Sequence, residues 1–173
     1  MLRPPLWRAA RVDGGAWRPR CSEVLPALIV GAYPTPEDAA WLRAEHRITA
    51  VLSLQDDADL ASKGLQLDGL RTAYDAAGVR FERAPLTDND VDMLRLQLPR
   101  IVAQLDALLA HDHRVYLHCN AGVNRAPTVA IAYLHARCGL PLEEARDHVK
   151  ARLHCVPYMR LLAEMYSAAT PCR

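Results

Sequence analysis

Two residues with complementary chemistry, Cys119 and Arg125, flank a short loop within RVYLHCNAGVNRAPTVAIAYL, residues 114–134. The apolar residues before Cys119 predict a buried strand, and those after Arg125 predict a buried helix. In α/β folds, ligands bind where parallel strands end and the next helices begin. Backbone N–H groups at such a junction form a cradle for anions. The sequence therefore predicts an anion site here.

The loop residues suit a phosphate group. Gly122 permits backbone angles that other residues rarely adopt. The planar guanidinium of Arg125 can hold two phosphate oxygens at once, and Pro127 suits the first turn of the helix. The residues that we expect to bind phosphate are Asn120, Ala121, Gly122, Val123, Asn124 and Arg125.

Cys119 would lie at the centre of this electropositive field. Thiols beside Arg and helix N-termini ionise more readily than free thiols, and the thiolate is the nucleophile. The pattern therefore favours attack of Cys119 on phosphorus over the alternative, a buried structural cysteine beside a surface arginine. We expect His118 to support the loop through a hydrogen bond to the backbone, and the alternative for it is a core histidine that only fills space.

The elements around the loop alternate between strands and helices. Strand patterns cover residues 27–34, 48–55, 79–86 and 114–119, and helix patterns cover residues 35–47, 67–78, 99–111, 126–138, 141–153 and 158–169. Residues 56–64 and 87–92 are predicted to be polar loops. We therefore predict a single α/β domain with a central, largely parallel sheet flanked by helices.

The segment HCNAGVNR resembles the HCxxGxxR signature of the cysteine-dependent protein-tyrosine and dual-specificity phosphatases. The resemblance extends from residue 22 to about residue 165. Within that superfamily, LIVGAYPTPEDAAWL, LSLQDDADL, TDNDVDMLRLQLP and HCNAGVNRAPTVAIAYL are most similar to the plant starch (glucan) phosphatases, and CNAGV also resembles laforin.

The resemblance implies a two-step mechanism that requires no metal and no cofactor. Cys119 would form a cysteinyl-phosphate, and Arg125 with the loop N–H groups would stabilise the equatorial oxygens. An Asp would protonate the leaving oxygen and then activate water. Alignment with the family's acid loop places this acid at Asp88, with Asp90 as the second candidate, whereas Asp92 is expected to be a solvated or capping residue.

Several positions depart from the family pattern. Ala126 replaces the Ser or Thr whose hydroxyl helps the thiolate leave in the second step, so that step is expected to be slow. Glucan phosphatases carry Gly at the position of Asn124 and surround the site with aromatic side chains. The matching positions here are Ser62, Lys63 and Asn89. The substrate therefore stays open between phosphoprotein, phosphoglucan and a small phosphoester.

The composition excludes several other classes. The chain has 173 residues and a net charge of +1, so no basic field indicates nucleic acid or a membrane surface. Its five cysteines are odd in number and widely spaced, which argues against a disulfide framework and favours a reducing compartment such as the cytoplasm. We expect a monomer. A pseudophosphatase that only binds phosphorylated ligands is the alternative from another functional class.

The N-terminal residues differ from the rest of the chain. Residues 1–20 carry five Arg and one Asp, a balance found in organelle-targeting sequences, but Pro and Gly pairs would interrupt an amphipathic helix. We expect residues 1–21 to be a poorly ordered or peripherally packed extension, with organelle targeting as the alternative. Residues 22–173 would form the catalytic domain.

Overall fold

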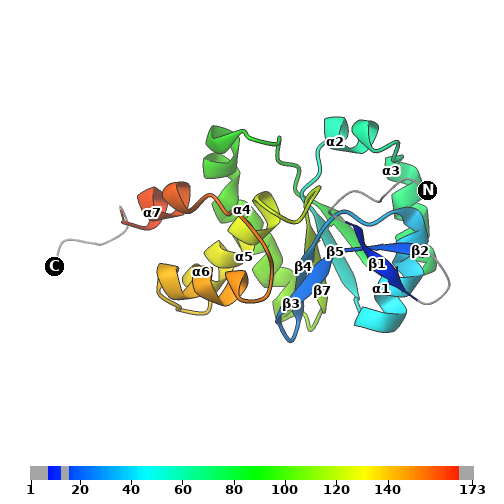
Figure 1. Ribbon diagram of the computed structural model, residues 1–173, viewed down its shortest axis with the longest axis horizontal. Helices are drawn as coiled ribbons and strands as arrows, with labels where there is room; N and C mark the ends of the chain where they lie inside the picture. The colour runs from blue at the N-terminus through cyan, green and yellow to red at the C-terminus, as the bar shows by residue number, and fades with distance from the viewer. Residues whose placement is uncertain (1–7, 13–15, 168–173) are drawn as a thin grey trace.

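A five-stranded sheet forms the centre of the computed structural model, which describes residues 8–12 and 16–167 (Figure 1). The strand order is β3-β4-β7-β5-β6, and only the β3–β4 pairing is antiparallel. The strands are β3 (Cys21–Leu25), β4 (Leu28–Gly31), β5 (Ala50–Ser53), β6 (Arg80–Arg83) and β7 (Val115–His118). The predicted α/β class with a largely parallel sheet is confirmed.

Helices cover both faces of this sheet (Figure 1). One face carries α4 (Val91–Ala110), α5 (Arg125–Ala136), α6 (Leu142–Lys150) and α7 (Met159–Ser167). The other carries the 3-10 turn η1 (Pro36–Asp38), α1 (Ala39–His46), α2 (Asp57–Ser62) and α3 (Leu67–Ala76). The central helix α5 is buried along most of its length, as its apolar sequence predicts.

Alternating side chains of each strand belong to different cores. In β4, Leu28 and Val30 pack into the core beneath α4 and α5, whereas Ile29 packs into the core beneath α1 and α3. In β7, Leu117 packs into the core beneath α4 and α5, and Tyr116 packs into the core beneath α1 and α3. A strand that is buried on both faces becomes continuously apolar, which explains the apolar runs in the sequence.

Two sequence predictions on this fold are wrong. Residues 56–64, predicted to be a polar loop, contain α2, whose first turn is closed by a reciprocal capping box between Asp56 and Asp59. The polar composition of the segment is typical of a loop, but the capping box stabilises a helix there.

The second error concerns the start of α4, which begins at Val91 and not at Pro99. Asp90 caps the helix by accepting a hydrogen bond from the Met93 N–H, and Leu94 and Leu98 are buried in the core. This packing outweighs the hydrogen bond that Pro99 removes in the helix interior.

The described part of the N-terminal segment forms a two-stranded antiparallel sheet of β1 (Arg8–Val12) and β2 (Ala16–Pro19). Arg18 joins it to the domain through an ion pair with the buried Asp38 at 2.9 Å. The boundary at residue 21 stays a prediction, and residues 1–7 and 13–15 lie outside the description. None of the described helices combines the length and apolar content that crossing a membrane requires.

Candidate active site

The loop between β7 and α5 holds both residues from which a reactive site was predicted. Cys119 follows the last residue of β7, and Arg125 is the first residue of α5. Cys119 is 3% exposed and Arg125 is 2% exposed. Residues 119–125, here called the phosphate loop, therefore lie directly in front of the N-terminus of a buried helix, where backbone N–H groups favour an anion.

Gly122 shapes the phosphate loop in two ways. Its φ is +69°, and a Cβ atom there would lie 2.6–2.8 Å from backbone atoms of Gly31 and Ala32. The same side of the loop is held by the Tyr33 N–H, which donates to the Asn120 carbonyl at 2.8 Å. The loop thus packs on the end of β4, and a side chain at position 122 would separate the two.

The opposite side of the phosphate loop rests on residues that follow α6. The Val156 N–H donates to the Val123 carbonyl at 2.8 Å, and Asn124 Nδ2 donates to the Val156 carbonyl at 2.8 Å. Asn124, which departs from the glucan signature, is therefore used to connect the loop to this segment.

Arg125 is held by a partner that the sequence did not reveal. Its Nη1 donates to Asp59 Oδ2 at 2.6 Å and to the Leu86 carbonyl at 2.6 Å. Asp59 also accepts a hydrogen bond from Asn120 Nδ2, and Gln55 Nε2 donates to Asn120 Oδ1 at 2.7 Å. The Asp59 side chain is 10% exposed, so α2 provides a buried carboxylate that fixes the guanidinium.

The signal that could have identified Asp59 was the Asp56-x-x-Asp59 spacing of a helix cap, together with the need of a buried Arg for a counter-charge. Burial lowers the pKa of Arg125, but the hydrogen bond to Asp59 and the charges of Cys119, Asp59 and Asp88 raise it by more, so the net shift is upward.

A second nitrogen of the Arg125 guanidinium, Nε, is not used in the hydrogen bonds that the described residues make. This nitrogen is buried. Asp88 Oδ1 lies 3.3 Å from this nitrogen, in an ion pair without hydrogen-bond geometry. Because Nε–H is one prong of the fork that binds phosphate oxygens, this N–H is available to an anion in the loop.

The three candidate acids have different surroundings. Asp88 faces Arg125, and its side chain is 49% exposed. Asp90 is the N-cap of α4, where its carboxylate accepts from the Met93 N–H at 2.8 Å. Asp92 lies exposed in the first turn of α4. The structure brings only Asp88 of these three into an ion pair with the guanidinium, and the catalytic roles stay proposals.

His118 lies directly behind the nucleophile candidate. It is 2% exposed, and its Nδ1–H donates to the Cys119 carbonyl at 3.0 Å. Burial lowers the pKa of His118 to about 4, although the bond to Cys119 opposes the shift. The imidazole is therefore neutral at physiological pH, and the hydrogen bond fixes the backbone at Cys119.

The rim of the loop carries aromatic rings at positions that the sequence comparison did not anticipate. Lys63 Nζ lies 5.8 Å from the centroid of the Tyr33 ring, and the Tyr158 hydroxyl donates to Asn89 Oδ1 at 3.4 Å.

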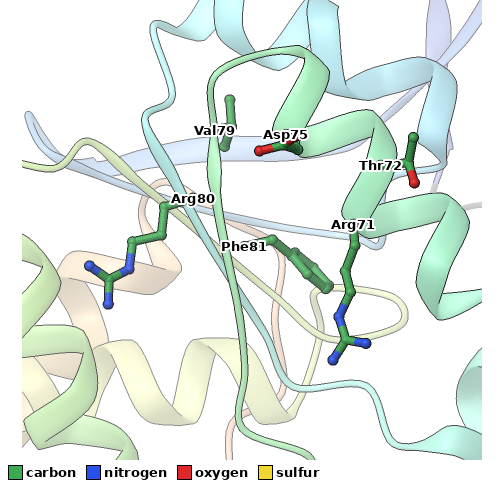
Figure 2. Close-up of a pocket in the computed structure, with 6 residues that line it drawn as sticks. All are labelled: Arg71, Thr72, Asp75, Val79, Arg80 and Phe81. Carbon is green, nitrogen blue, oxygen red and sulfur yellow. The ribbon is translucent and has the colours of Figure 1, made fainter.

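A separate hollow of about 480 Å³ beside β6, shown in Figure 2, shares no residue with the phosphate loop or the Asp88 loop. The described residues include no group of three or more His, Cys, Asp or Glu arranged for a metal ion.

Comparison with known proteins agrees with this geometry. Residues 28–170 match the family model described as dual specificity phosphatase, catalytic domain. The chain belongs to the dual-specificity phosphatase family. The resemblance of its sequence to this family is thereby confirmed.

The relatives include proteins named as phosphoglucan phosphatases and as protein phosphatases, which also confirms the resemblance of the sequence to the glucan phosphatases. Phosphoglucan phosphatase DSP4, amyloplastic, of Castanea sativa is 34% identical over 139 residues, which are 78% of this chain and 36% of that protein. Laforin of Mus musculus is 27% identical over 76% of this chain and 43% of its own length. Dual specificity protein phosphatase 2 of Homo sapiens is 31% identical over 75% of this chain and 37% of its own length. The chain thus spans less than half the length of each of these relatives.

A solved structure supports the fold as well. Tk-PTP in the active form superposes with a TM-score of 0.70 at 22% identity, over 85% of this chain and 96% of that one. At this identity the likeness concerns the fold.

Asp59→Asn is expected to destabilise the protein by about 1.5–3 kcal/mol, since it leaves the buried Arg125 without its counter-charge. It should also weaken the binding of inorganic phosphate. Urea unfolding and phosphate titration measure both effects. Asp57→Asn is the matched control, because Asp57 lies on the same helix and pairs with Arg83 but is 89% exposed. That variant should change stability by less than about 1 kcal/mol, and equal effects of both variants would contradict the account.

The neutral state of His118 predicts a pH dependence of stability. The pKa of His118 is about 4 in the folded protein and near 6.5 in unfolded chains. Between pH 4 and pH 6.5, His118 is therefore more often protonated in the unfolded state than in the folded state. Stability should therefore fall as the pH is lowered from 6.5 towards 4, by at most about 1.4 kcal/mol per pH unit from this residue. Urea unfolding at a series of pH values should show a shallower slope for His118→Asn. An identical slope in the two proteins would show that His118 titrates normally when folded.

Proposed function

We propose that the protein hydrolyses phosphate monoesters through a cysteinyl-phosphate intermediate, as a dual-specificity phosphatase. The observation that carries the proposal is the state of Arg125. Asp59 and Leu86 hold Nη1 of its guanidinium, while the buried Nε–H, 3.3 Å from Asp88 Oδ1, has no hydrogen-bond partner among the described residues. A phosphate in the loop would satisfy that N–H and the N–H groups at the start of α5.

Hydrolysis would proceed in two steps, formation of the cysteinyl-phosphate and its hydrolysis. Cys119 Sγ, as a thiolate, attacks phosphorus while the P–O bond to the leaving group breaks, and protonated Asp88 gives its proton to the leaving oxygen. The Asp88 carboxylate then takes a proton from water, the water oxygen bonds to phosphorus, and the P–S bond breaks to return the thiolate. Arg125 and the loop N–H groups stabilise the phosphoryl oxygens in both steps. Ala126 supplies no hydroxyl to the departing sulfur, which supports a slow second step.

The substrate class proposed is phosphorylated protein at Tyr, Ser or Thr. The alternative is a phosphoglucan, supported by the identity to the phosphoglucan phosphatase of Castanea sativa. Ser62, Lys63 and Asn89 themselves carry no aromatic ring, which favours the first choice, although the Tyr33 ring lies beside Lys63 and Tyr158 bonds to Asn89. A second alternative is a pseudophosphatase, which binds phosphorylated ligands without hydrolysing them. The presence of Cys119, Arg125 and Asp88 together argues against it.

We further propose a monomer that works in a reducing compartment such as the cytoplasm. The described cysteines Cys21, Cys119, Cys138 and Cys155 are all free thiols, and the nucleophile must remain reduced to act. Interaction with nucleic acid or membranes is not part of the proposal.

The test of the function is hydrolysis of para-nitrophenyl phosphate in the presence of a chelator. The wild-type protein should turn over the substrate without added metal, because no step uses one. Cys119→Ser should lose turnover but retain binding of inorganic phosphate, since Arg125 and the loop remain. The proposal fails if chelation abolishes the wild-type rate and a divalent cation restores it, or if Cys119→Ser keeps substantial turnover.

Asp88→Asn should lower the rate on an alkyl phosphate by roughly 10²–10⁴-fold, the usual contribution of a general acid. The loss should be smaller for para-nitrophenyl phosphate, whose leaving group needs less protonation. Asp90→Asn is the matched control from the same loop, and it should lower the rate much less, because the Asn side-chain oxygen can still accept the Met93 N–H bond that caps α4. Steady-state rates on both substrates decide which of Asp88 and Asp90 is the general acid. If only Asp90→Asn shows a loss that depends on the leaving group, the acid is Asp90 and not Asp88.

A further inference from the structure

Exposed apolar side chains gather beside the phosphate loop. Three large hydrophobic residues are exposed within the described chain: Val91 at 38%, Val156 at 60% and Leu96 at 76%. Val156 forms backbone hydrogen bonds with Val123 and Asn124 of the loop, and Val91 follows the acid loop directly. Two of the three therefore flank the candidate catalytic residues, where a substrate would cover them.

A hollow of about 360 Å³ extends from this apolar rim. It is lined by Val91, Arg95, Tyr158, Arg160, Leu161 and Glu164, between the starts of α4 and α7. Figure 1 shows these two helices side by side at the end of the domain that is distant from β1 and β2.

Tyr158 connects this hollow to the catalytic loops. Its hydroxyl bonds to Asn89, next to Asp88, and its N–H donates to Thr128 Oγ1 at 2.9 Å. Thr128 in turn donates to the Asn124 carbonyl at 2.7 Å. A substrate group in the hollow would therefore be held at a defined position relative to the phosphate.

The far wall of the hollow is positively charged. Arg95 and Arg160 share one carboxylate, Glu164, at 2.5 Å and 2.9 Å. Two guanidinium groups against one carboxylate leave a net charge of +1 and N–H groups for a second anion. The hollow thus combines an exposed apolar side chain, Val91, with the guanidinium groups of Arg95 and Arg160.

We propose that this hollow is a specificity subsite for a phosphorylated protein segment with an aliphatic residue beside the phosphorylated one and an acidic residue beyond it. The inference rests on the proposed phosphatase function and narrows its substrate. The aliphatic side chain would cover the exposed Val91, and the carboxylate would pair with Arg160 and Arg95.

A glucan chain fits these walls less well. Its hydroxyl groups would lose water against Val91 without gaining hydrogen bonds there, and unmodified sugar rings provide no anion for the arginine pair. The charge and the apolar rim together therefore favour a peptide.

Three phosphotyrosine peptides test the subsite: one with alanine throughout, one with leucine on both sides of the phosphotyrosine, and one with glutamate added two residues further out. Selectivity is kcat/KM for each peptide divided by that for para-nitrophenyl phosphate. Wild-type protein should prefer the leucine peptide over the alanine peptide by roughly 5–10-fold, within the range for an apolar group in a pocket. The glutamate peptide should gain a further factor of about 2–5, typical of an exposed ion pair.

Two variants assign these preferences to the hollow. Val91→Ser should remove most of the leucine preference, and Arg160→Gln should remove the glutamate preference. Leu96→Ser is the matched control, because Leu96 is exposed on the same helix but does not line the hollow, and it should change neither.

The same peptides are titrated against Cys119→Ser to measure their dissociation constants, which separates the two proposals. If the wild-type protein turns over nothing but the affinities follow the predicted order, the phosphatase function fails and the subsite stands. If para-nitrophenyl phosphate is hydrolysed but the peptides do not differ, or Leu96→Ser acts like Val91→Ser, the subsite is overturned. Faster turnover of phosphorylated amylopectin than of every peptide would also overturn it.

Discussion

The ion pair between Arg125 and Asp59 is the interaction on which the candidate site depends. Arg125 is 2% exposed, and its guanidinium stays charged when buried, so that without a nearby anion its lost hydration would be costly. Asp59 provides that anion on one end of the group and leaves the Nε edge facing the loop. The protein thereby stabilises a buried cation and keeps free an N–H for which we propose phosphate as the ligand.

This pair is formed by the topology of the sheet. Because β4, β5, β6 and β7 are parallel, their carboxyl ends lie at one edge, and the loop after each strand reaches the site. Tyr33 follows β4, Asp59 follows β5, Asp88 follows β6 and Cys119 follows β7. Residues between 33 and 125 are brought together in this way without a long-range disulfide or metal.

Parts of this arrangement could be predicted from the sequence, and the reasons differ by residue. The strand at 115–118 and helix at 125–136 were predictable because both are continuously apolar, and the Cys-Gly-Arg spacing between them marked the loop. Asp59 was not, since its partner lies 66 residues away and α2 depends on a cap within a polar segment. The start of α4 was misplaced because burial of Leu94 and Leu98 outweighs the local preference of Pro99. The apolar rim was also invisible, because whether Val91 and Val156 are exposed is decided by tertiary packing.

We propose that Arg125 binds a structural anion and a substrate anion at the same time, and a crystal structure with bound tungstate or vanadate tests this most directly. We expect the oxyanion in the loop of residues 119–125, with Arg125 Nε and a second guanidinium N–H on its oxygens, while Nη1 stays on Asp59 and Leu86. An Arg125 side chain that leaves Asp59 to reach the anion, or an anion bound outside this loop, would contradict it.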